Sequence, residues 1–189
     1  MDSFDHELRY IQAAVSQLEN YLLSDDLYRP IGITSGYGEK PYPALTIGNL
    51  LLSEIRARGY ESSSAERKKF RQVQVQLDRI RTQWSAAWQA KVKQEMRARV
   101  ELWANFLDDY REKPEANFDR YPYEVGRRVM IQVLSDQDDT VSPQLSELIK
   151  GLDRYLKTVI REDDFLWEPQ LTSVFPRDPF WYLYGQLSK

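Results

Sequence analysis

The residue types that most often carry catalysis are scarce in this chain. Among its 189 residues there is one histidine, His6, and no cysteine. Sites built from several histidines or from thiolates are therefore excluded, and a Ser-His-Asp triad is disfavoured. Any nucleophilic catalysis would need a serine, threonine or lysine without its usual neighbouring base. We expect His6 to be exposed to solvent in the first turn of a helix, and we expect no cofactor.

Carboxylates are the next residues with possible chemistry. They gather in four acidic clusters: Asp25 and Asp26; Asp108 and Asp109; Asp136, Asp138 and Asp139; and Glu162, Asp163 and Asp164. Oxygen ligands from several clusters could hold a hard cation. Neighbouring acids near helix ends are more often solvated or capping, and the cluster at Asp136 lacks the fixed glycine of an EF-hand loop. We therefore predict no metal site.

Basic side chains are concentrated in one segment of an otherwise acidic protein. Residues 56–100 have a net charge of +8, whereas residues 1–55 have −5 and residues 101–189 have −6. The basic members include Arg67, Lys68, Lys69, Arg71, Arg79, Arg81, Lys91, Lys93, Arg97 and Arg99. They could bind phosphates, but they do not share one helix face, and a pI near 5.4 disfavours nucleic acid. We expect this segment to pair with acidic segments of its own chain or of a second subunit.

Aromatic residues crowd the last third of the chain, interleaved with arginines. A pocket walled by such rings and cationic groups could bind a small ligand. Its candidate residues are Arg127, Arg128, Tyr123, Trp167, Trp181 and Tyr184. The alternative is a packed core in which tyrosine hydroxyls reach water. Both interpretations stay open from the sequence.

A long helical stretch must position the basic segment. Neither glycine nor proline occurs between Gly59 and Pro114, and Ser63 with Glu66 forms a capping-box motif. Apolar residues from Phe70 onward recur about every 3.6 residues, the period of an α-helix. We predict one very long helix over about 63–111, roughly 70 Å long. Its weakest point is 82–85, where β-branched and hydroxyl residues cluster.

Shorter helices are expected on either side of this long one. Cap signals and apolar periodicity place them at Ser3–Ser24, Thr46–Gly59, Tyr121–Leu134, Pro143–Arg161 and Phe180–Leu187. We detect no pattern typical of a β-strand. The predicted fold is all-α: a single all-helical domain over residues 1–189, arranged as a bundle of about six helices around the long one.

The length of the predicted helix suggests a function. A compact chain of this size has a radius of gyration of only about 16 Å, so the helix would overhang its own domain. We therefore predict a non-catalytic interaction or scaffold protein that self-associates through this helix, as a homodimer or with another helical protein. The candidate interaction surface comprises Trp84, Trp88, Arg67, Lys68, Lys69 and Arg71.

Two other functions remain as alternatives. The first is a small-ligand-binding helical protein, a sensor or an enzyme of unfamiliar type, that uses the aromatic and arginine pocket. The second, less favoured, is nucleic-acid binding by the basic segment. The sequence has no apolar run long enough to cross a membrane, and its acidic start is unlike a signal peptide. We expect a cytoplasmic protein.

Overall fold

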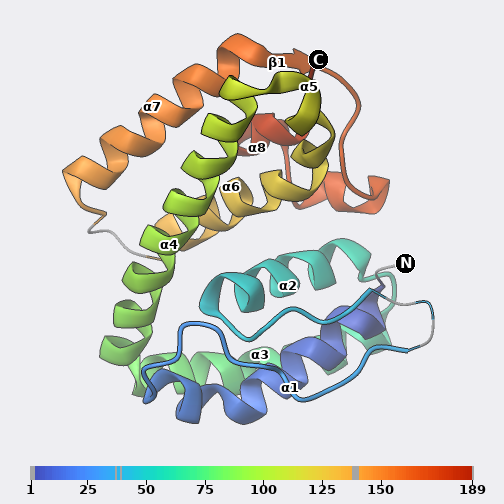
Figure 1. Ribbon diagram of the computed structural model, residues 1–189. Helices are drawn as coiled ribbons and strands as arrows, with labels where there is room; N and C mark the ends of the chain where they lie inside the picture. Colours follow the sequence, from blue (N-terminus) through green and yellow to red (C-terminus); the bar gives the residue numbers. More distant parts are fainter. Residues whose placement is uncertain (1–2, 37, 39, 138–140, 189) are drawn as a thin grey trace. The chain divides into compact units, whose positions relative to one another are not determined.

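The chain folds almost entirely into helices, which confirms the predicted all-α class (Figure 1). The computed structural model describes residues 3–36, 38, 40–137 and 141–188. The helices are α1 (Phe4–Leu22), α2 (Ile47–Tyr60), α3 (Ser64–Gln83), α4 (Ser85–Glu112), α5 (Pro114–Asn117), α6 (Tyr121–Ser135), α7 (Pro143–Val159) and α8 (Arg177–Phe180). The 3-10 turns are η1 (Phe118–Arg120), η2 (Pro169–Ser173) and η3 (Trp181–Leu183), and the strands are β1 (Ile160–Glu162) and β2 (Gly185–Leu187).

The long helix expected over 63–111 is divided at Trp84. This residue has φ −111° and ψ 33°, outside the helical range, and separates α3 from α4. The break lies in the stretch that the sequence marked as weakest, because hydroxyl, β-branched and aromatic residues there disfavour helix. Each piece is about 30 to 42 Å long. A single helix that overhangs its domain is therefore not confirmed, and the length argument for self-association no longer holds.

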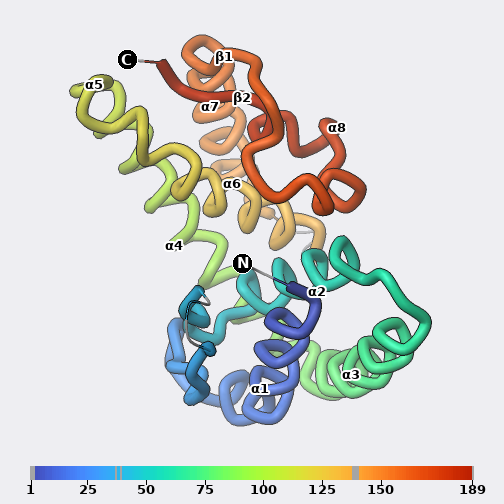
Figure 2. The backbone as a smooth tube through the Cα atoms, turned by 90° about the vertical axis from the view of Figure 1, so that its right-hand side faces the viewer, coloured from blue at the N-terminus to red at the C-terminus, as the bar shows by residue number. Residues whose placement is uncertain are grey.

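The chain forms two compact units, Met1–Glu95 and Met96–Lys189, and α4 contributes residues to both. In the first unit α1 packs against α2 and α3, as Figures 1 and 2 both show. In the second unit the rings of Trp103, Phe106 and Tyr121 lie against one another in the core. The expectation of one domain over 1–189 stays a prediction.

Side-chain caps begin the helices of the first unit where the sequence predicted them. The side-chain oxygens of Ser3, Thr46 and Ser63 each accept a backbone N–H three residues further on. Glu66 completes the capping box by accepting the backbone N–H of Ser63. One cap was wrongly predicted: Gly59 lies inside α2, without a left-handed conformation.

The C-terminal segment differs from the predicted helix Phe180–Leu187. It contains η3 followed by β2, which pairs antiparallel with β1 so that Ile160 lies opposite Leu187 (Figure 2). A Cβ atom at Gly185 would lie 2.6 Å from the Arg161 carbonyl oxygen, so the close approach of the strands requires glycine there. The helix predicted to continue to Arg161 ends at Val159, where β1 follows.

His6 is another correction, because it is buried and not solvated. Only 5% of its surface is exposed, and its ring stacks on that of Tyr42 with centroids 4.4 Å apart. Tyr42 belongs to the loop between α1 and α2, which covers this part of α1. The sequence near His6 does not predict this burial, because the loop that covers His6 lies far from it along the chain.

Candidate interaction surface

Helix α3 has a narrow buried side and a wide exposed one. Of its 20 residues, Phe70, Val73 and Leu77 are the buried ones. Their spacing of three and four residues places them on one stripe, and Phe70 packs edge-on against Phe4 of α1. A helix in the core of a globular protein usually has a wider apolar stripe. Most of the surface of α3 is therefore free for other contacts.

The side of α3 opposite the buried stripe is basic. Lys68, Arg71, Val75 and Arg79 are all exposed and follow one another at steps of three, four and four residues. We call these four residues the basic stripe. Val75 is a large apolar side chain in the middle of the stripe, and 64% of its surface is exposed.

Few of the basic side chains on α3 are neutralised within the chain. Arg67 forms an ion pair with Glu61 at 3.3 Å. Within the described part of the chain, Lys68, Lys69, Arg71 and Arg79 form no ion pair. Glu61 belongs to the same basic segment, so among the described residues of α3 we see no ion pair with the acidic segments. Such pairs come from α2, where Arg56 lies 3.8 Å from Glu7 and Arg58 lies 4.0 Å from Glu54. Most of the positive charge on α3 faces solvent.

The six residues predicted for an interaction surface are not equally placed. Arg67, Lys68, Lys69 and Arg71 are exposed in the first half of α3. Trp84 lies half-buried at the break. Trp88 is not part of an exposed surface, unlike the prediction. Only 1% of its surface is exposed, and the Arg81 guanidinium lies 5.3 Å from its ring centroid. Its ring belongs to the interior of the protein.

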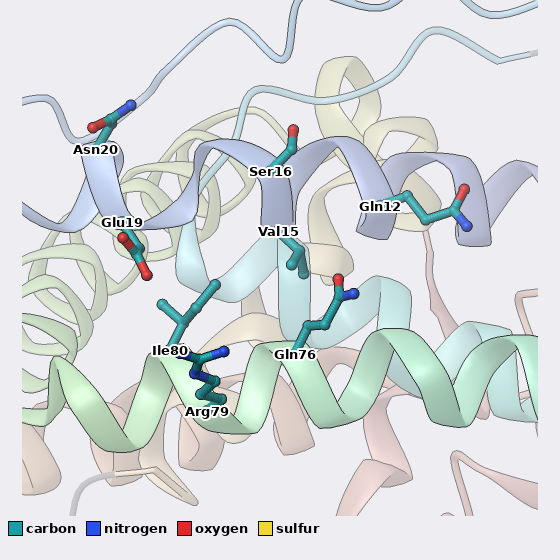
Figure 3. Close-up of a pocket in the computed structure, with 8 residues that line it drawn as sticks. All are labelled: Gln12, Val15, Ser16, Glu19, Asn20, Gln76, Arg79 and Ile80. Carbon is teal, nitrogen blue, oxygen red and sulfur yellow. The ribbon is translucent and has the colours of Figure 1, made fainter.

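A shallow groove runs between α1 and α3 (Figure 3). Its volume is about 490 Å³, and its walls are Gln12, Val15, Ser16, Glu19 and Asn20 from α1 with Gln76, Arg79 and Ile80 from α3. Val15 and Ile80 point from opposite helices toward the space between them. Sequence reasoning missed this groove, because it forms from two helices that are far apart in sequence.

Two charged residues of α4 hold the first unit together. Lys91 Nζ donates to the backbone carbonyls of Ser24, at 2.7 Å, and Asp26, and lies 4.7 Å from the Tyr21 ring centroid. Burial lowers the pKa of Lys91. Glu95 accepts the backbone N–H of Gly48 at 2.8 Å, in the first turn of α2. Lys91 therefore fixes the turn that follows α1, and Glu95 fixes the start of α2.

One of the two arginines of the predicted ligand pocket, Arg128, belongs to a largely buried ion pair. Arg128 of α6 donates from Nε and Nη2 to the two carboxylate oxygens of Asp153 in α7, both at 2.8 Å. Its guanidinium also lies 4.6 Å from the Tyr182 ring centroid. The Tyr121 hydroxyl donates to the Tyr182 carbonyl at 2.7 Å, and burial raises the pKa of both tyrosines. These contacts join α6, α7 and η3.

The other five predicted pocket residues make separate contacts. Arg127 forms an ion pair with Glu124, and Tyr123 is 79% exposed. Trp167 packs edge-on against Phe175, Trp181 packs edge-on against Tyr182, and the Tyr184 hydroxyl donates to the Phe175 carbonyl. These contacts resemble the packed-core alternative, and the ligand pocket stays a prediction.

The structure adds two observations on metals and membranes. No three His, Cys, Asp or Glu side chains among the described residues are grouped to hold a metal ion. Asp138 and Asp139 of the predicted acidic cluster lie outside the described residues. Within the same part of the chain, no helix combines the length and the hydropathy that a membrane crossing needs.

Comparisons with known proteins give no relative for this chain. No protein-family model matches it. No curated protein and no solved structure matches it either. The functional argument therefore depends on the chain's own residues.

Proposed function

We propose that this chain is a non-catalytic interaction or scaffold protein that self-associates through α3. The observation that carries the proposal is the basic stripe, which has exposed cations without acidic partners among the described residues and Val75 at its centre. Exposed charges that have no partner in their own chain can select a surface of opposite charge, and Val75 between them would be buried in such a contact.

The alternative of a small-ligand-binding protein has less support. The rings that would wall its pocket lie against other rings, and Arg128 is already engaged by Asp153. A basic helix that binds nucleic acid is also less favoured, because the whole chain has a net charge of −3.

Analytical ultracentrifugation tests the proposal. The wild-type chain should show a mass that rises with protein concentration at low salt. Val75→Glu should lower this tendency, because a charge at the centre of the contact would be desolvated. Gln94→Glu, an exposed change on α4 that adds the same charge, should behave like wild type. A wild-type chain that stays monomeric at all concentrations would overturn the proposal.

A further inference from the structure

We propose that the basic stripe of α3 binds an acidic stripe on α4 of a second copy of the chain, with the two helices antiparallel. This inference rests on the proposed self-association and names the surface that α3 contacts. The acidic stripe comprises Glu101, Asn105, Asp108 and Glu112, which are all exposed. Their steps of four, three and four residues place them on one side of α4.

The acidic stripe has negative charge that its own chain leaves largely uncompensated. Glu101 and Glu112 form no ion pair with any residue that the structure describes. Asp108 pairs with Arg111 at 2.8 Å, and more than half of each side chain is exposed. Such an exposed pair contributes little to stability, so Asp108 can exchange its partner at small cost.

The two stripes match in length. Lys68 and Arg79 are 11 residues apart, and so are Glu101 and Glu112. Eleven residues are about three turns and about 16 Å of helix. Lys68 and Arg79 therefore project from the same side of α3, and Glu101 and Glu112 project from the same side of α4. Two helices in contact can therefore bring both ends of the stripes together in one register.

An antiparallel arrangement also matches the residues between the ends. If Lys68 lies opposite Glu112, then Arg79 lies opposite Glu101 and Arg71 lies close to Asp108. Val75 then faces Asn105, which is uncharged, so the exposed apolar side chain meets no carboxylate. A parallel arrangement would place Val75 opposite Asp108 and would leave Arg71 beside Asn105. Antiparallel helix dipoles add a further small preference.

A second copy is the partner that the charges indicate. Residues 56–100 have a net charge of +8 and residues 101–189 have −6, so each copy has both surfaces. A second copy has an acidic surface with the required spacing, so its charge complements the basic stripe.

A charge-swap experiment tests this pairing directly. The first variant, K68E/R79E, reverses the ends of the basic stripe, and the second, E101K/E112K, reverses the ends of the acidic stripe. Each variant alone should self-associate at least about tenfold more weakly than wild type, because attraction becomes repulsion at two positions. An equimolar mixture of the two should associate again, because each variant then meets opposite charge on its partner.

Two controls separate this inference from a general charge effect. K93E/R97E changes the net charge by the same amount as K68E/R79E at other exposed positions, and it should keep wild-type association. Far-UV circular dichroism should show that all variants remain helical. Raising the salt concentration should weaken wild-type association, because exposed charge pairs are screened.

The outcomes distinguish the inference from the function on which it rests. If wild type self-associates but the mixture does not, the stripe pairing is wrong and the proposed function stands. If wild type stays monomeric, both fail. If K68E/R79E instead abolishes binding to a duplex DNA probe while self-association is unchanged, the basic stripe serves nucleic acid and the inference is overturned.

Discussion

Replacement of Lys91 by methionine tests the most detailed contact in the first unit. Methionine retains most of the apolar stem of lysine but removes the ammonium group. The change therefore deletes the hydrogen bonds to the Ser24 and Asp26 carbonyls and the contact with the Tyr21 ring. The two carbonyls at the end of α1 would then lack this donor.

The loss of stability expected for Lys91→Met follows from two opposing effects. A hydrogen bond from a charged donor contributes about 1.5–3 kcal/mol, so the two bonds together contribute about 3–6 kcal/mol. Desolvation of the ammonium, the effect that lowers the pKa of Lys91, offsets part of this gain. We expect Lys91→Met to lower the free energy of unfolding by about 2–4 kcal/mol.

Urea unfolding followed by circular dichroism measures this loss, and Lys93→Met is the matched control. Lys93 is exposed on the same helix, so its replacement should change stability by less than about 0.5 kcal/mol. Hydrogen exchange should also become faster in residues 23–29 of the Lys91 variant alone. If the two variants unfold at the same urea concentration, the structural role assigned to Lys91 is wrong.

Three further changes test other buried contacts. Burial raises the pKa of Glu54, so the stability linked to its protonated form is lost as the pH rises through its folded-state pKa. Glu54→Gln should therefore stabilise the protein at neutral pH but not at about pH 3. Urea titrations at both pH values would show the difference. Gly48→Ala would place a methyl group 2.7 Å from Oε1 of Glu95 and should cost about 1–3 kcal/mol, so an unchanged Tm would contradict the close packing there. Asp153→Asn removes the charge that faces buried Arg128 and should cost about 3 kcal/mol in chemical denaturation; a loss below about 1 kcal/mol would show that the ion pair is not needed.

Local signals in the sequence were sufficient for most of the helix boundaries. Ser3, Thr46 and Ser63 mark helix starts because a capping oxygen reaches an N–H only three residues away. The break at Trp84 also lies in a locally weak stretch. The local pattern could not decide between a bend and a break, because low helix propensity allows either one.

Features that depend on distant residues could not be predicted in the same way. The strand Gly185–Leu187 pairs with β1, a segment that precedes it by more than twenty residues, so the local apolar pattern alone did not reveal it. Trp88 looked suitable for an interaction surface by residue type, but the chain buries it under Arg81. The basic residues of α3 were predictable from composition, whereas the absence of acidic partners for most of them, among the residues that the structure describes, required the folded chain.

The double membership of α4 has a practical consequence for dividing the chain. Lys91 and Glu95 of its first half complete α1 and α2, while Trp103 and Phe106 of its second half form part of the other core. A fragment that stops after α3 would lack the donor for the end of α1 and the acceptor for the start of α2. Any dissection into halves must therefore duplicate α4, so that each fragment keeps its own copy of the helix.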